Sequence, residues 1–324
     1  MIIVTGGAGL IGSAVVWTLN KRGVKKILIV DHDPDRTKED NYKKLNYSGY
    51  SDKSDFLDEL ERGKYGDNIE AIIHLGACTD TTETDKDYLH ENNFLYTQRL
   101  ATFAVENNIR FIYASSAATY GNGNRGYLDD EHLIPNFEPL NEYARSKQTF
   151  DMWAWENGFL DKIVGLKYFN VFGPNEDHKG DMQSMVRKSF RQIWANGAVN
   201  LFKSPDPDYE DGEQKRDFLY VKDAAKMTLF FIDKPNLNGI YNIGSGMAET
   251  WNTLIGAVFS AVDMEPNINY IDMPDNIREQ YQYYTKAEME KLFNAGYEER
   301  TTPLADAVKD YVLNYLISGN HLQL

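Results

Sequence analysis

The chain has 324 residues, of which 42% are hydrophobic and 26% are charged, and its net charge of −15 gives an isoelectric point near 4.9. This composition is typical of a folded globular protein with about two domains. The negative field repels nucleic acids and anionic membrane surfaces, so we expect neither as a partner, and an anionic ligand would need a local basic pocket. No apolar run approaches the ~20 residues that a bilayer crossing needs.

Two features of the sequence bear on its compartment. Met1 leads directly into a β-branched segment rather than a basic region, so we expect no cleaved leader. Cys78 is the single cysteine, which excludes an internal disulfide and fits a reducing environment. We therefore expect a cytoplasmic protein, and no residue pattern predicts a metal site.

Short apolar segments alternate with amphipathic segments in the first half of the chain. This alternation predicts a parallel sheet with helices on both faces, which right-handed crossovers turn into a doubly wound Rossmann sheet of the α/β class. The expected strands are residues 2–5, 27–31, 71–75, 110–115 and 163–168, and the expected helices are 11–22, 88–107 and 141–157.

The alternation weakens after residue 168, where turn residues become frequent and strands short. We predict a dinucleotide-binding Rossmann domain over residues 1–168. Residues 169–324 are expected to form a smaller, mixed α/β domain that mainly binds substrate, with some segments returning to the Rossmann domain.

A glycine-rich turn joins the first expected strand to the first expected helix. Gly6, Gly9 and Gly12 permit a tight turn in which backbone N–H groups and the helix N-terminus face a pyrophosphate. Asp31 ends the second expected strand, where an acid can bind a ribose hydroxyl. A glycine-rich turn without a ligand is the alternative, but strand, turn, helix and acid all stand in the expected order.

The same region leaves the choice of dinucleotide open. Asp31 by itself favours NAD, because a carboxylate repels a 2′-phosphate. Arg36 and Lys38 follow in the next loop and are able to neutralise that phosphate, unless they are only solvated charges.

Tyr143 and Lys147 are four residues apart at the start of an expected helix and therefore share one face. A tyrosine with a pKa near ~10 is a weak base at neutral pH, and a nearby ammonium lowers that value. The spacing alone is common among exposed helix residues. Ser116, at the carboxyl end of an expected strand, adds a hydroxyl for substrate, although its alternative role is to satisfy backbone groups.

Together these motifs resemble the extended short-chain dehydrogenase/reductase superfamily. Within it, nearly the whole chain resembles the ADP-L-glycero-D-manno-heptose 6-epimerase family. The closer resemblance is carried by residues 1–9, 76–78, 92–93, 113–121, 168–174, 178–180 and 215–221, with His178-Lys179-Gly180 as the most diagnostic part.

The resemblance implies inversion of C6 of the heptose in ADP-D-glycero-D-manno-heptose, for synthesis of a lipopolysaccharide core precursor. The reaction proceeds by transient oxidation and re-reduction with bound NADP, with NAD as the alternative cofactor. Tyr143 corresponds to the proton-transferring group on one face and Lys179 to that on the other, and Lys179 would need a lowered pKa. A homo-oligomer, pentameric in the family pattern, is also implied.

The resemblance also implies the ligand contacts, to which the glycine turn adds its own residues. For the cofactor these are Gly6, Gly9, Leu10, Ile11, Gly12, Asp31, His32, Lys38, Lys53, Leu75, Gly76, Ala77, Cys78, Thr79, Asn92, Lys147 and Val171. For the substrate they are Ser116, Asn170, Asp181, Lys188, Phe202, Lys203, Ser204, Arg216 and Tyr281.

Three positions depart from the family pattern. Leu75 replaces an acid, Asp181 replaces a small hydroxyl residue, and Lys188 replaces a histidine. The redox residues are unaffected, whereas the nucleotide and the sugar become less well determined.

Other functions differ from this one in the residues that they require. A UDP-hexose 4-epimerase needs only one tyrosine and would not require Lys179. A 4,6-dehydratase carries two acids where this chain has Ala117 and Ala118. A non-catalytic protein that senses a dinucleotide commonly lacks the tyrosine and the lysine, and a structural module leaves all three motifs unexplained.

Overall fold

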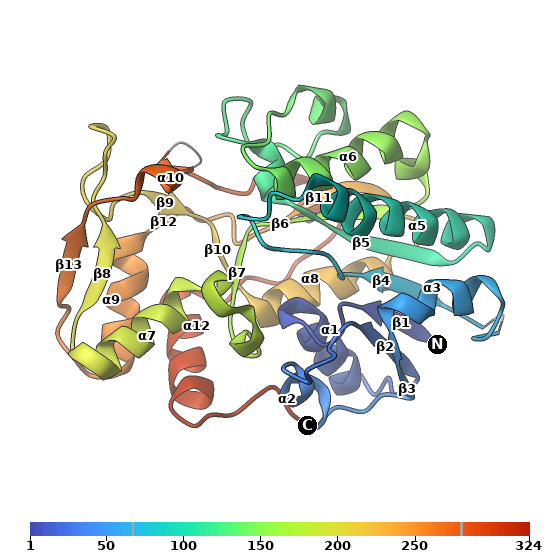
Figure 1. Cartoon of the computed structure of the whole chain (residues 1–324), viewed down its shortest axis with the longest axis horizontal. Helices are drawn as coiled ribbons and strands as arrows, with labels where there is room; N and C mark the ends of the chain where they lie inside the picture. The colour runs from blue at the N-terminus through green and yellow to red at the C-terminus, as the bar shows by residue number, and fades with distance from the viewer. Residues whose placement is uncertain (67, 279–280) are drawn as a thin grey trace.

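The computed structural model describes residues 1–66, 68–278 and 281–324. Within these ranges the central element is a seven-stranded sheet of strand order β11-β6-β5-β4-β1-β2-β3, all parallel (Figure 1). Its strands are β1 (Ile2–Thr5), β2 (Ile27–Asp31), β3 (Gly49–Asp52), β4 (Ala71–His74), β5 (Arg110–Ser116), β6 (Val164–Tyr168) and β11 (Gly239–Ile243). The predicted α/β class and doubly wound sheet are confirmed.

Alternate residues of β1 enter two hydrophobic cores, one on each face of the sheet. Ile3 packs in one core with Phe56 and Leu100, which belong to α3 (Lys53–Glu61) and α5 (Tyr96–Glu106). Val4 packs in the other core with Val15 of α1 (Leu10–Lys21). Because both faces are covered, β1, β2 and β4 consist of fully buried residues and read in the sequence as continuous apolar runs.

The expected helices are present with one difference. The segment expected as one helix over 88–107 is divided into α4 (Lys86–Leu89), a π-helical turn η1 (His90–Leu95), and α5. The helix that carries Tyr143 is α6 (Glu142–Glu156), and Asn141 caps its N-terminus. Figure 1 shows α5 and α6 on one side of the sheet and α1 on the other.

Residues beyond 168 contribute to the sheet as well. β11 pairs with β6 and forms an edge of the sheet, and α8 (Val221–Asp233) packs against α1. The assignment of the rest of 169–324 to substrate binding stays a prediction.

The remaining elements include three two-stranded sheets, β10–β7, β12–β9 and β13–β8, in the described part of the chain. Figure 1 shows α7, α9, β8 and β13 grouped to one side of the central sheet. The bounds are α2 (Glu39–Tyr42), η2 (Ala117–Tyr120), η3 (Glu131–Asn136), η4 (Phe159–Asp161), β7 (Asn170–Phe172), η5 (Asp177–Met182), α7 (Met185–Asn196), β8 (Val199–Phe202), β9 (Lys215–Arg216), β10 (Phe218–Tyr220), β12 (Glu249–Thr250), α9 (Trp251–Ala261), β13 (Ile268–Ile271), α10 (Asp275–Arg278), α11 (Glu290–Asn294), α12 (Leu304–Tyr311) and η6 (Val312–Leu316).

No helix among the described residues combines the length and the apolar character needed to cross a membrane.

Candidate active site

A cavity of about 1020 Å³ opens at the carboxyl ends of the sheet strands. Its wall includes Gly6, just after β1, and Leu75, just after β4. These two strands are neighbours, and the order of the sheet reverses between them, which is where doubly wound sheets bind ligands. The volume lies at the upper end of the usual range for ligand pockets, ~300–1,000 Å³.

Most of the predicted site residues lie in the wall of this cavity. They are Gly6, Gly9, Leu10, Ile11, Gly12, Asp31, His32, Lys53, Leu75, Gly76, Ala77, Cys78, Thr79, Asn92, Ser116, Tyr143, Lys147, Asn170, Val171, Lys179, Arg216 and Tyr281. The predicted residues outside the wall are Lys38, Asp181, Lys188, Phe202, Lys203 and Ser204.

The glycine turn leaves no room for larger side chains. Gly6 has a φ of +64°, and a Cβ there would lie 2.6 Å from the backbone nitrogen of Gly76. A Cβ on Gly12 would lie 2.0 Å from the carbonyl oxygen of Gly6. Because Gly9 is the N-cap of α1 and has no side chain, the first N–H groups of the helix stay available to a pyrophosphate. The turn therefore fits a dinucleotide.

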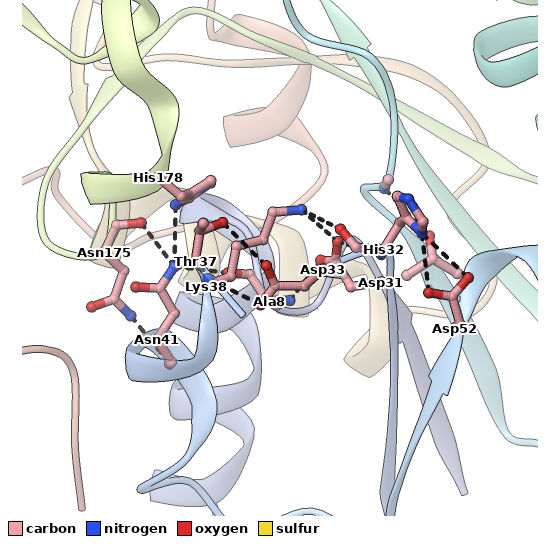
Figure 2. Close-up of polar contacts among 12 residues, drawn as sticks. Ala8, Asp31, His32, Asp33, Thr37, Lys38, Asn41, Asp52, Asn175 and His178 are labelled. Carbon is pink, nitrogen blue, oxygen red and sulfur yellow. Dashed lines mark hydrogen bonds and ion pairs between the residues drawn. The ribbon is translucent and has the colours of Figure 1, made fainter. Parts of the chain in front are cut away.

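Asp31 is bonded within the protein on both carboxylate oxygens (Figure 2). Oδ2 accepts the N–H of Ala8 at 2.9 Å, and Oδ1 accepts the N–H of His32 at 2.8 Å. Oδ1 also lies 2.7 Å from the ammonium of Lys38, which donates to the His32 carbonyl as well. Lys38 thus lies outside the wall but neutralises an acid that belongs to it.

Lys53 and Asn92 form a second pair of polar side chains, near Asp31. Lys53 donates to the side-chain oxygen of Asn92, and burial lowers the pKa of Lys53. The next residue, Asn93, lies in the π-helical turn and bonds both backbone groups of Cys78, at 2.8 and 3.0 Å. Burial raises the pKa of the Cys78 thiol, which disfavours a nucleophilic thiolate.

Tyr143 and Lys147 lie where α6 meets β5. Lys147 is 5% exposed and donates to the carbonyl oxygen of Ala114 at 2.9 Å, and burial lowers its pKa to about 8. Burial raises the pKa of Tyr143, while a hydrogen bond with Ser116 opposes the rise. The direction is opposite to the lowering that we expected from Lys147, because burial is the larger influence.

Ser116 fills the alternative role that the sequence left open, satisfying backbone groups, while its contact with substrate stays a prediction. Its oxygen accepts the N–H of Ala118 at 3.1 Å and so caps η2. Ser116 also lines the cavity, as Tyr143 does.

Lys179 lies in η5, which is kinked at the next residue, Gly180, where φ is +51°. Burial lowers the pKa of Lys179, Glu176 opposes this, and Lys188 adds to the lowering. The direction is that expected for a lysine that exchanges protons near neutral pH. Its neighbour His178 also lines the cavity.

Arg216 lies at the other end of the cavity and is 6% exposed. Its guanidinium is 5.0 Å from the ring centre of Tyr281 and 5.7 Å from that of Trp251. The indole N–H of Trp251 donates to the Tyr281 hydroxyl at 2.9 Å, which fixes both rings. A planar cation held in this way suits a diphosphate. Trp251 was not predicted from the sequence. The pairing of β12 with β9 brings it to Arg216, and no local sequence pattern indicates that pairing.

The other residues predicted to bind substrate are engaged elsewhere. The ammonium of Lys188 donates to the Asp181 carbonyl at 2.5 Å, and Lys203 pairs with Asp272 at 3.0 Å. Ser204 bonds Asp211 and Asp206 within its loop, and Phe202 ends β8. Of the three basic residues predicted to contact the substrate, Arg216 lies in the wall of the cavity, whereas Lys188 and Lys203 do not.

In the described ranges, no group of three or more His, Cys, Asp or Glu side chains is arranged to hold a metal ion.

Known proteins resemble the chain over its full length. The model of the NAD dependent epimerase/dehydratase family matches residues 2–244. A protein of Nitratidesulfovibrio vulgaris is 48% identical over 320 residues, 99% of each chain, and one of Fusobacterium nucleatum is 47% identical, with 98% of each chain covered. Both are named ADP-L-glycero-D-manno-heptose-6-epimerase.

Solved structures agree with these relatives. The ADP-L-glycero-D-manno-heptose-6-epimerase of Helicobacter pylori is 26% identical, with a TM-score of 0.80 over 97% of this chain and 95% of that one. A UDP-N-acetylglucosamine 4-epimerase of Methanobrevibacter ruminantium is 25% identical, with a TM-score of 0.82 over 98% of each chain. The chain therefore belongs to the NAD dependent epimerase/dehydratase family and, within it, to the ADP-L-glycero-D-manno-heptose-6-epimerases.

Proposed function

We propose that the protein inverts C6 of the heptose in ADP-D-glycero-D-manno-heptose, giving the L-glycero epimer for lipopolysaccharide core synthesis. The observation that carries the proposal is that Tyr143, from α6, and Lys179, from η5, line one cavity together with the glycine turn. The names of relatives up to 48% identical support the choice of substrate.

The chain's own residues handle the protons of this reaction. A bound dinucleotide supplies the acceptor and then the donor of the C6 hydride. In the oxidation, one of Tyr143 and Lys179 accepts the proton of the C6 hydroxyl. In the reduction, the other donates a proton to the C6 oxygen, and the two exchange roles in the reverse direction. Lys147 favours the phenolate of Tyr143 by its charge.

We propose NADP as the preferred cofactor, with NAD as the alternative. Both oxygens of Asp31 are engaged, and the Lys38 ammonium neutralises its charge, so repulsion of a 2′-phosphate is reduced. His32 and Lys53 lie in the adjoining wall and add donors. At the opposite end, we assign the diphosphate of the sugar nucleotide to Arg216.

We further propose a cytoplasmic homo-oligomer, pentameric if it follows the family pattern, with residues 169–324 supplying most substrate contacts. The resemblance to the family and the single cysteine support this. Light scattering on the purified protein measures the assembly directly.

A UDP-hexose 4-epimerase is the competing assignment within the superfamily, and the 25% identical 4-epimerase structure is the observation behind it. That reaction needs one proton-transferring tyrosine, so Lys179→Met would leave it unaltered. Under our proposal Lys179→Met abolishes epimerisation, and a non-catalytic dinucleotide sensor would show no turnover in either form.

The deciding experiment is incubation with ADP-D-glycero-D-manno-heptose, followed by NMR at C6, in parallel with UDP-glucose. Inversion at C6 of the heptose alone is expected. Unchanged C6 in a protein that demonstrably holds its dinucleotide would contradict the assignment.

A further inference from the structure

Buried polar side chains join the glycine turn to the segment that carries Lys179 (Figure 2). Asn41 of α2 is at the centre and is 2% exposed. Its amide nitrogen lies 2.8 Å from the carbonyl oxygen of Ala8, in the glycine turn, and 3.2 Å from that of Asn175. The same nitrogen lies 3.3 Å from Nδ1 of His178, the residue before Lys179.

Asn41 also contacts the ring of His178. An amide nitrogen only donates, so its two hydrogens are shared among three neighbours, and Nδ1 of His178 accepts one of them in the tautomer that leaves Nδ1 unprotonated. Burial lowers the pKa of His178 to about 4, with Lys38 and Lys179 acting in the same direction. His178 is therefore neutral at pH 7 and able to accept this bond.

Asn175 holds the chain in a turn that needs support. Its φ is +76°, a left-handed value that asparagine tolerates but that persists only where neighbours impose it. Its side chain donates to Ser13 of α1 at 3.0 Å and accepts from the backbone of Leu322 at 3.1 Å. The amide also approaches the Asn41 carbonyl at 3.4 Å, so the two asparagines bond in both directions.

Glu176, the residue after Asn175, is fixed as well. Glu176 is fully buried and accepts from the backbone and the hydroxyl of Ser184, both at 2.6 Å. It also accepts from the hydroxyl of Tyr311 at 2.8 Å. Ser184 is the N-cap of α7 and Tyr311 is the last residue of α12, so these bonds anchor the segment to both helices. Two contacts reach across to the dinucleotide side: Asn175 donates to Ser13 of α1, and Asn41 donates to Ala8 in the glycine turn itself.

Asn41 and Lys38 belong to one short turn of the backbone. Lys38 immediately precedes α2, and its ammonium bonds Asp31 at the adenosine end of the cavity. Three residues later, Asn41 contacts the segment that holds Lys179. A ligand that draws on Lys38 therefore acts on the same turn that positions Asn41.

We propose that Asn41 is a positioning residue that couples occupancy of the dinucleotide site, through α2, to the placement of Lys179. The inference rests on the dinucleotide site of the proposed function and not on the identity of the sugar. It predicts that the cofactor orders the second proton-transferring group as well as the first.

Hydrogen exchange with mass spectrometry tests the coupling on the full-length protein without substrate. NADP is expected to slow amide exchange in residues 175–182 of the wild type by about 5- to 150-fold, the range of typical coupling between sites. In Asn41→Ala the slowing at 175–182 is lost, whereas the slowing at the glycine turn, residues 6–12, remains. Slowing at 175–182 that survives in Asn41→Ala overturns the proposal.

Asn20→Ala is the matched control. The Asn20 side chain also bridges backbone segments, through bonds of 2.9 Å to Val24 and 2.8 Å to Asn46. None of these bonds involves residues 175–182. This variant is expected to keep the slowing in both regions. If it loses the slowing at 175–182 as Asn41→Ala does, the effect is general loosening and the proposal fails.

If Asn41→Ala does not fold, Asn41→Ser replaces it. A single hydroxyl hydrogen cannot serve both the Ala8 and the Asn175 carbonyl, so the same loss is expected. Absence of any slowing at 6–12 in the wild type would overturn the dinucleotide site and the coupling together. Failure to act on ADP-heptose, by contrast, leaves this experiment and its outcome unaffected.

Discussion

The ammonium group of Lys167 lies 2.7 Å from the carboxylate of Asp151, and both side chains are fully buried. The carboxylate also accepts from the hydroxyls of Tyr113, at 2.9 Å, and Ser115, at 2.6 Å. Asp151 is on α6, two turns after Tyr143, whereas its partners are on β5 and β6. This pair therefore fixes the helix that presents Tyr143 against the sheet.

Asp151→Ala should destabilise the fold by about 3–5 kcal/mol, because it leaves the Lys167 ammonium buried without its partner. Replacing both residues with apolar side chains, as Asp151→Leu with Lys167→Met, should restore much of that loss. Urea unfolding measures both. A double variant no more stable than the single one would show that the lost hydroxyl contacts, and not the unpaired charge, dominate.

Lys147→Met separates activity from stability. Its folded-state pKa of about 8 lies below the ordinary 10.5, so the fold disfavours the ammonium. The resulting loss of folding free energy has its full size below about pH 8 and disappears above about pH 10.5. At pH 7 the variant should therefore unfold at the same or a higher temperature, while kcat/KM falls ~10²- to 10⁴-fold. A lower melting temperature together with the loss of activity would point to a structural role instead.

The pH dependence of the reaction follows from the same group. As pH rises through about 8, Lys147 loses the charge that, in the proposed mechanism, favours the Tyr143 phenolate, and kcat/KM should decline. Lys147→Arg keeps a charge at every pH of interest, so its remaining activity should extend to higher pH. An alkaline limit identical in both proteins would assign it to another residue.

The strands next to the dinucleotide were predictable because their signal is local. β1, β2 and β4 are buried on both faces, and the glycine turn follows β1 directly. β3 was missed because Gly-Tyr-Ser-Asp at the sheet edge carries little apolar character. β11 was missed because its place beside β6 depends on pairing between residues 164–168 and 239–243, which no local pattern reveals.

The candidate site likewise combines features with a local sequence signal and features that depend on long-range contacts. The glycine turn and the Tyr143–Lys147 spacing are local, whereas the contact of Asn41 with Asn175 spans 134 residues. Lys203 was expected near the substrate from the family resemblance, but it pairs with Asp272 across the β8–β13 edge. Such pairings depend on tertiary packing, so resemblance alone places residues in the site more broadly than geometry does.

Lys38→Ala should weaken NADP binding by about 10- to 150-fold and change NAD binding little, since a charge-assisted hydrogen bond contributes about 1.5–3 kcal/mol. The loss also frees Asp31 to repel a 2′-phosphate. Titration calorimetry with both dinucleotides measures the ratio. Lys44→Ala is the control, because Lys44 is exposed and bonds Gln323 instead. Equal weakening of NAD and NADP would remove Lys38 from any role in choosing between them.

Arg216→Lys tests the diphosphate end of the cavity. A lysine keeps the charge but loses the planar fork that pairs two oxygens, so KM for the sugar nucleotide should rise by about 10- to 150-fold with a smaller change in kcat.

Trp251→Phe keeps an aromatic face near Arg216 but removes the N–H that fixes Tyr281. Its KM should rise less than that of Arg216→Lys, because the guanidinium itself remains. The change in KM compared with the change in kcat decides the outcome. A contact with the diphosphate, away from the reacting carbon, stabilises the ground state and the transition state alike, so its loss raises KM more than it lowers kcat. If kcat falls as strongly as KM rises in Arg216→Lys, the guanidinium acts on the transition state, and the diphosphate must be bound elsewhere.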